Sequence, residues 1–411
     1  MARSVAHRAR PGLLTNGPFA RLLCAQIVTQ VGTQMNNTAG AWLLYRLTQS
    51  PLALGMEGLC FSAPMAVLPL VTGGLADRYD RVRLVRLALL AEAAQAFAVA
   101  GLAALGDLRA WMFYAGAVLG AVRLAVTIPA QSALLPAVVE PERLSGAVAL
   151  SSATWTSSAL LGPAGAGLLA AVAGPAAVFA LNGVATVASW VTIRSLHLPP
   201  PVGPDGEPAT APRLGGMRYL RQHRRLLRLV LVTVVAMVGA IGMETLLPVF
   251  ATKTWPVGVV GYGLLRAAPG VAAVVGGIIL SARPNCLMEG AGPANRRLAA
   301  CFVAAAACFG LFAGGPPLPV ALAALTVGSL ALTIALASAT SEVQQSVPDR
   351  LRGRTGAVAS MGQNGLAGLA AVGVAGAAAR EGPAAAVTGL AVFVGATGAA
   401  LSAAGRGRPE P

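Results

Sequence analysis

Twelve apolar stretches follow one another along the 411 residues of this chain, most of them long enough to cross a lipid bilayer as a helix. A helix that crosses the hydrocarbon core needs about 20 residues, because it rises about 1.5 Å per residue. The stretches lie near residues 20–46, 52–75, 84–105, 110–134, 146–170, 175–196, 227–251, 257–281, 297–314, 317–342, 355–378 and 384–404. We therefore expect an all-α membrane protein with twelve transmembrane helices.

The composition excludes the two main alternatives to a membrane protein. Only 11% of the residues are charged, whereas about 25% are charged in a typical soluble domain. The hydrophobic fraction is 56%, and a disordered chain would instead be poor in hydrophobic residues. Neither a soluble globular fold nor a disordered chain fits these values.

The basic residues predict how the chain is oriented in the membrane. The net charge is +15, which could also be typical of a nucleic-acid-binding protein. If both termini are cytoplasmic, however, 24 of the 30 basic residues lie in segments on the cytoplasmic side, and only four lie on the outer side. This is the bias of the positive-inside rule. We therefore expect a multi-pass protein of the plasma membrane, embedded in lipid, with cytoplasmic termini and no nucleic-acid partner.

One long polar segment divides the chain into two similar halves. Residues 197–226 are rich in proline and arginine and predict a cytoplasmic linker that ends in a surface-lying basic helix. The predicted domains are a cytoplasmic tail at 1–19, a six-helix bundle at 20–196, this linker, a second six-helix bundle at 227–404 and a cytoplasmic tail at 405–411.

The two halves repeat short patterns in the same order. Pro51 and Pro64 in the first half recur as Pro256 and Pro269 in the second, at an offset of 205 residues. Ordered matches at half the chain length indicate a parallel duplication, in which an axis along the membrane normal relates two pseudo-symmetric bundles. Transporters built in this way hold their substrate near the midplane, between the halves.

A motif between the second and third stretches carries a resemblance to a known family. The sequence from Gly73 to Arg81 reads GGLADRYDR, which resembles the G-x-L-A-D-R-x-x-R signature of the major facilitator superfamily. The resemblance implies the fold of that superfamily, with Gly73, Asp77, Arg78 and Arg81 at a cytoplasmic gate. It also implies that Asp77 faces the start of the eleventh helix, near Thr355.

A second element resembles the antiporters of the same superfamily. The fifth stretch contains Gly162, Pro163 and Gly167 in a pattern similar to the antiporter element G-x-x-x-G-P-x-x-G-G, although Ser158 and Ala166 depart from it. Ordinary close packing of helices is the alternative interpretation, because proline and glycine bend a helix and let its neighbours approach.

Two further patterns indicate the branch of the superfamily. Leu119 and Arg123 match the start of a drug-antiporter element, but Val126 and Thr127 replace its Gln-Gly pair. Together with residues 347–354, these elements look most like the enterobactin-exporter and macrolide-efflux branch. That resemblance implies export of a drug, siderophore or other secondary metabolite.

Polar residues follow one face of the first helix. Gln26, Gln30, Thr33 and Asn37 are spaced by four, three and four residues, and such a face should line a cavity or a helix interface rather than contact lipid. At an offset of 207 residues, Asn37 corresponds to Glu244 in the seventh helix. We expect Glu244 to be the proton-coupling acid. The alternatives are a structural partner of Arg266 or of another buried base, and a substrate-binding group.

Other polar residues are further candidates for a substrate cavity. Arg123 would be its cationic partner, unless it makes only an interhelical hydrogen bond. Neutral side chains in the tenth and eleventh helices suit a bulky, partly polar solute: Thr333, Gln363 and Asn364. Two carboxylates have more structural interpretations. We expect Glu57 to form an ion pair with Arg46 on the outer side, and Glu92 to stabilise the packing of a peripheral helix.

The sequence lacks the patterns of the main enzyme classes. It has no glycine-rich phosphate-binding loop, so direct use of ATP is not expected. Its five cysteines form no C-x-x-C pair, and its three histidines lie in polar segments, so we expect no metal, no cofactor and no catalytic residues.

We therefore expect a monomeric secondary transporter that exports an amphipathic small molecule in exchange for protons by alternating access. An importer or uniporter on the same fold is the first alternative, and a membrane receptor or scaffold is the second.

Overall fold

Helices account for all the regular structure in the described part of the chain, which comprises residues 17–68, 81–140, 143–194, 215–282 and 293–403 of a computed structural model. The helices are α1 Gly17–Thr48, α2 Pro51–Val67, α5 Arg81–Leu105, α6 Ala110–Val138, α7 Leu144–Arg194, α8 Gly215–Gln222, α9 Arg224–Lys253, α10 Gly258–Ala282, α11 Pro293–Ala313, α12 Leu318–Ser346, α13 Asp349–Glu381 and α14 Pro383–Ala403.

These helices form twelve spans, as the sequence predicts. Nine of the described helices are long and apolar enough to cross a membrane. One of them, α7, has 51 residues and crosses twice, because Gly174 adopts φ 81° and breaks the helix between its two halves. A positive φ is strained for residues with a Cβ, which is why glycine occupies this turn. The other two spans are α1, with 32 residues, and α2, with 17 described residues.

The structure confirms the expected turn between the ninth and tenth spans. α11 ends at Ala313 and α12 begins at Leu318. Between them, Gly315 adopts φ 67° and the Pro316 carbonyl accepts a hydrogen bond of 2.9 Å from Trp255 Nε1. These short connections, like those between α1 and α2 and between α13 and α14, lie at what we call the short-turn end of the bundle, which the charge distribution predicts to be the outer end.

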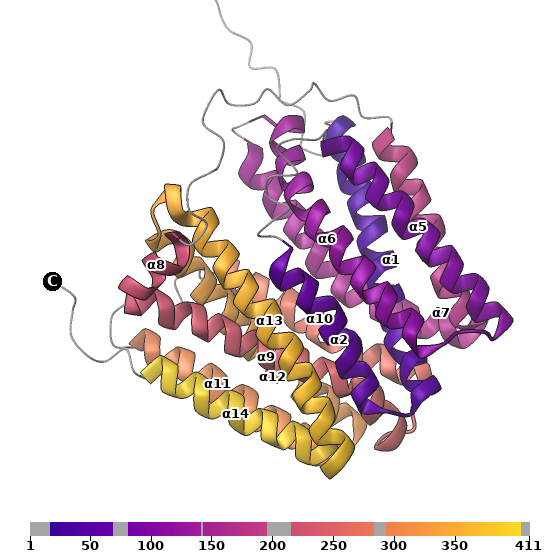
Figure 1. The fold of residues 1–411 in the computed structure, drawn as a ribbon. Helices are drawn as coiled ribbons and strands as arrows, with labels where there is room; N and C mark the ends of the chain where they lie inside the picture. Colours follow the sequence, from indigo (N-terminus) through magenta and orange to yellow (C-terminus); the bar gives the residue numbers. More distant parts are fainter. Residues whose placement is uncertain (1–16, 69–80, 141–142, 195–214, 283–292, 404–411) are drawn as a thin grey trace, which may run out of the picture.

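The spans pack as two groups of helices (Figure 1). The first group contains α1, α2, α5, α6 and α7, and the second contains α9 to α14. The short helix α8 packs on α13 and α9 through the buried Leu220, while Met217, Arg218 and Arg221 are exposed. This is the arrangement expected of a surface-lying basic helix.

The two groups meet mainly along two helix pairs, α2 with α13 and α7 with α10. Glycines make this close approach possible. A Cβ added at Gly55 in α2 would lie 2.7 Å from the Ala375 Cβ and 2.8 Å from the Ala371 carbonyl oxygen in α13. Near the short-turn end, the rings of Trp42 in α1 and Tyr262 in α10 stack with their centroids 5.4 Å apart.

The predicted gate motif lies mostly outside the described residues. Gly73, Asp77 and Arg78 fall in the segment 69–80, and Arg81 is the first residue of α5. The role of the motif in gating stays a prediction.

Candidate functional site

The second group of helices contains a membrane-embedded ion pair. The Arg266 Nη1 atom in α10 lies 2.8 Å from the Glu244 Oε2 atom in α9. Both side chains are partly exposed, at 23% for Arg266 and 24% for Glu244. Arg266 is thus a direct structural partner of Glu244. The coupling role of Glu244 stays a prediction.

Glu57, in the first group of helices, interacts with this ion pair. It lies in α2, is partly buried, and is close enough to Arg266 to interact with it electrostatically. Tyr262, one turn before Arg266 in α10, interacts electrostatically with Arg266 and with both carboxylates. Tyr114 in α6 interacts with Glu57. Glu57 of the first half thus interacts electrostatically with an ion pair held within the second half.

The structure corrects one expectation about Glu57. The predicted ion pair between Glu57 and Arg46 is not present, although both residues are described. The reason is the rotation of the two helices: Glu57 faces α6 and α10, whereas Arg46 lines a different space, between α1, α7 and α10.

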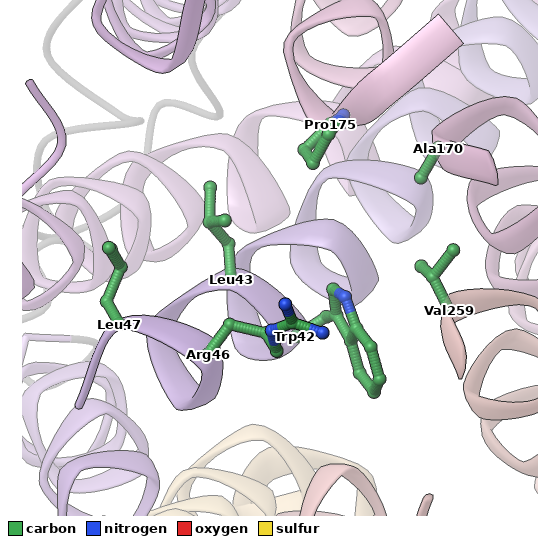
Figure 2. A pocket seen from close by; sticks show the side chains of 7 residues that line it. All are labelled: Trp42, Leu43, Arg46, Leu47, Ala170, Pro175 and Val259. Carbon is green, nitrogen blue, oxygen red and sulfur yellow. The ribbon is translucent and has the colours of Figure 1, made fainter. Parts of the chain in front are cut away.

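Arg46 borders a pocket of about 420 Å³ near the short-turn end. Figure 2 shows Trp42, Leu43, Arg46 and Leu47 from α1 on one side of this pocket, with α7 and α10 supplying the rest of the lining: Ala170, Pro175 and Val259. The lining is apolar apart from the Arg46 guanidinium and the Trp42 ring nitrogen. This pocket does not include Glu57, Glu244 or Arg266.

A second intramembrane ion pair lies wholly within the first group of helices. The Arg123 Nη1 atom in α6 is 2.9 Å from the Glu92 Oε2 atom in α5. The Thr33 hydroxyl in α1 donates a hydrogen bond of 2.7 Å to the Glu92 Oε1 atom. The Glu92 side chain is 7% exposed and that of Arg123 is 18% exposed. This arrangement joins α1, α5 and α6, so Arg123 and Thr33 both contact Glu92.

We expect Arg123→Leu to destabilise the folded protein by about 3–5 kcal/mol, the usual cost of removing one partner from a buried ion pair. The loss leaves the Glu92 carboxylate buried without a counter-charge. The midpoint of thermal unfolding of the purified protein in detergent measures the effect. The double variant Glu92→Gln/Arg123→Leu should regain most of the lost stability, because it leaves no buried charge without a counter-charge. Equal stability of wild type and Arg123→Leu would contradict the structural role.

The polar residues on one face of α1 differ in burial and in their partners. Gln26 and Gln30 are partly buried and Asn37 is exposed, whereas Thr33 is engaged by Glu92. In a membrane protein an exposed Asn side chain needs a water-filled or protein environment, so Asn37 fits a cavity lining better than a lipid-facing position.

The neutral candidates in the second group of helices make contacts within that group. The Gln363 side-chain amide in α13 donates a hydrogen bond of 2.9 Å to the Thr233 hydroxyl in α9. The Asn364 side-chain amide donates to the Ser360 carbonyl oxygen in its own helix, at 2.9 Å. Thr333 in α12 is partly buried against Gly276 of α10. All three are available to a solute only through their remaining donor and acceptor atoms.

The antiporter-like element lies where α7 packs on its neighbours. A Cβ added at Gly162 would collide with Gln34 in α1. On the other side of the element, a Cβ added at Gly263 in α10 would lie 2.7 Å from the Pro163 carbonyl oxygen and 3.0 Å from the Gly167 Cα atom. The element therefore packs α7 tightly against both groups of helices, which is compatible with either interpretation made from the sequence.

Reasoning from the sequence misses two features of this region: the part played by Tyr262, and the interaction of Glu57 with residues of the other half of the chain. One signal was available, since the offset of 205 residues that relates the prolines of the two halves also relates Glu57 to Tyr262. Pseudo-symmetric positions near the axis between two bundles face each other. A search for polar pairs at this offset would have paired Glu57 with Tyr262.

Comparisons with known proteins agree with this arrangement. Residues 12–404 match the family described as transmembrane secretion effector. The macrolide efflux protein A of Streptococcus pyogenes is 25% identical over 267 residues, which cover 64% of this chain and 65% of that protein. The enterobactin exporter EntS of Shigella boydii is 26% identical over 287 residues, which cover 67% of each chain.

A solved structure supports the fold over a longer range. The nucleoside transporter NupG superposes with a TM-score of 0.74, covering 95% of this chain and 100% of that one at 12% identity. At this identity the similarity concerns the fold alone. The match to the macrolide efflux protein spans less than two thirds of its length, so its activity does not transfer to this chain directly.

Proposed function

The chain belongs to the transmembrane secretion effector family of the major facilitator superfamily, and we propose that it exports an amphipathic small molecule in exchange for protons. Membership makes it a multi-pass membrane transporter of small molecules and not an enzyme. The proposal adds the direction of transport, the coupling ion and the class of substrate.

The observation that carries the proposal is the partly exposed pair of Glu244 and Arg266 beside the interface between the halves. A carboxylate that is ionised in one state and protonated in the other can link proton binding to a conformational change. Its guanidinium partner stabilises the ionised form, so the carboxylate has a counter-charge inside the membrane. One proton that enters across 100 mV supplies about 2.3 kcal/mol, without any need for nucleotide hydrolysis.

Export is supported by the names of the relatives, one an efflux protein for macrolides and one an exporter of enterobactin. Both names refer to bulky solutes that carry polar groups. The neutral amides of Gln363 and Asn364, the exposed Asn37 and the apolar lengths of the helices suit such a solute better than a small ion.

Inside-out vesicles that contain the chain test the proposal directly. We expect an acidic lumen to drive uptake of a radiolabelled macrolide or of radiolabelled enterobactin, and a protonophore that collapses the pH gradient should stop it. Empty vesicles are the control. Uptake that ignores the gradient would indicate a uniporter, and uptake driven only by an alkaline lumen would indicate an importer; either result would contradict the proposal.

A further inference from the structure

The pocket beside Arg46 lies where several spans end, at the short-turn end of the bundle. Its walls come from the last two turns of α1, from α7 next to its break at Gly174, and from the start of α10. Its volume of about 420 Å³ falls within the range of about 300–1,000 Å³ that is typical of small-molecule sites. The pocket can therefore hold a ligand, or part of one, at the membrane surface.

The pocket has its charge at the rim and apolar side chains below. Arg46 lies in the last turn of α1, whereas Trp42 and Leu43 lie about one turn, or about 5.4 Å, deeper. On the facing wall, Pro175 follows the break in α7 and Ala170 lies one turn before it. Figure 2 shows that the Arg46 side chain runs toward Trp42. This order of groups fits an amphiphile that has its headgroup at Arg46 and an apolar chain below.

Arg46 is a cation without an anionic partner in the part of the chain that the structure describes. Its side chain is exposed, and none of the ion pairs between described residues includes it. A guanidinium has five N–H donors in a planar fork, which matches the oxygen atoms of a phosphate. Lipid headgroups lie at the level where membrane spans end. Charge complementarity therefore favours a phospholipid as the occupant of this pocket.

We propose that the pocket binds an anionic phospholipid from the leaflet at the short-turn end, which is predicted to be the outer leaflet. The phosphate lies on the Arg46 guanidinium, and the first part of an acyl chain packs on Leu43, Ala170 and Val259. This site is separate from the pair of Glu244 and Arg266, neither of which lines the pocket.

The bound lipid acts on the contact between the halves. All the lining residues but one come from α1 and α7, and Val259 of α10 completes the wall from the other half. A Cβ added at Gly167 in α7 would lie 2.9 Å from the Val259 carbonyl oxygen, so the two helices touch close to the pocket. Release of a solute at this end separates the halves and removes Val259 from the lining. A ligand that fits the complete pocket therefore favours the conformation in which the halves touch.

The charge requirement can be tested by native mass spectrometry of the purified protein, with lysophosphatidylglycerol as the probe. Wild type should bind it more tightly than lysophosphatidylcholine of the same chain length, because the choline group adds a positive charge. Arg46→Gln should weaken binding by about tenfold, equivalent to about 1.4 kcal/mol. Arg109→Gln is the matched control, since it removes an exposed arginine elsewhere at the same end and should bind like wild type.

The apolar part of the site can be tested without changing any charge. Ala170 lines the pocket and is 8% exposed, so Ala170→Leu should fill the space for the acyl chain and weaken binding several-fold. Ala171 is exposed, and Ala171→Leu should leave binding unchanged. The elution profile on size exclusion shows whether both variants are folded.

Three binding results would overturn the site and leave proton-coupled export intact. These are absence of binding to wild type, equal binding of the two lysolipids, and equal binding to wild type and Arg46→Gln. Equal binding to Ala170→Leu and Ala171→Leu would place the lipid outside the pocket and would also contradict the proposal. If radiolabelled enterobactin binds in an Arg46-dependent way and the lysolipid does not, the pocket belongs to the exported solute instead.

The effect on the halves rests on the proposed function, whereas lipid binding does not. Wild type should transport about twofold more slowly in vesicles of phosphatidylglycerol than in vesicles of phosphatidylcholine, as expected when the lipid holds half of the protein in one conformation. Arg46→Gln should remove this difference. Equal rates of wild type in both vesicles would overturn the effect on the halves. Absence of transport in both would contradict the proposed function, and the binding result would still decide the lipid site.

Discussion

Replacing Glu244 with glutamine should abolish efflux driven by a pH gradient. Glutamine has nearly the same shape and can still accept a hydrogen bond from Arg266, but it cannot ionise or release a proton. Arg266 then loses its ionised partner in α9. We expect a loss of at least about a hundredfold in the rate, equivalent to about 2.7 kcal/mol of barrier.

Uptake of a radiolabelled macrolide into inside-out vesicles measures this effect. Glu244→Asp keeps a titratable group and should retain part of the activity. Glu381→Gln removes the same chemical group at an exposed position at the end of α13, so its rate should equal that of wild type. If both Glu244→Gln and Glu381→Gln transport at the wild-type rate, Glu244 has no part in coupling.

Gly270→Leu should also reduce transport to background, for a steric reason. A Cβ at this position in α10 would lie 2.6 Å from the Ala159 carbonyl carbon and 2.6 Å from the Leu160 nitrogen in α7. These are backbone atoms and cannot rotate away, so the two helices must separate. Because α7 and α10 form one of the two main contacts between the halves, the conformation in which they touch becomes inaccessible.

The same helix supplies a matched control for this variant. Gly277 lies two turns further along α10, and a Cβ there would meet no atom within 4 Å. Gly277→Leu should therefore transport at close to the wild-type rate, whereas Gly270→Leu should not. The elution profile on size exclusion tests whether both variants are folded. Equal transport by both would show that close packing of α7 on α10 is not needed.

The positions of the spans could be predicted from the sequence because they depend on local properties. A run of about 20 apolar residues is enough to identify a span, whatever it later packs against. Glycine and proline also act locally, so the turn between α11 and α12 was predicted correctly from residues 314–317. The break inside α7 was also predicted, since spans were expected at residues 146–170 and 175–196 and Gly174 interrupts the helix between them.

The candidate site was predictable in its residues and less so in its contacts. Glu244 and Arg266 were both recognised as costly charges inside helices, and their pairing was one of the alternatives considered. Arg123 was expected either at the cavity or in an interhelical contact, and it contacts Glu92, which ties α5 to α6. Glu57 was assigned to Arg46 because both lie near the ends of consecutive helices, but closeness along the chain does not fix which way two side chains point.

The sequence by itself determined the number of spans, their likeness in two halves and the family motif, since each follows from hydrophobic length or from short patterns. Only the tertiary structure decided which charges meet. Glu57 and Arg266 are separated by more than 200 positions, and their electrostatic interaction depends on the rotation of α2 and α10 about their own axes. That rotation is set by glycine contacts such as those of Gly55 and Gly263, whose partners lie in the opposite half of the chain.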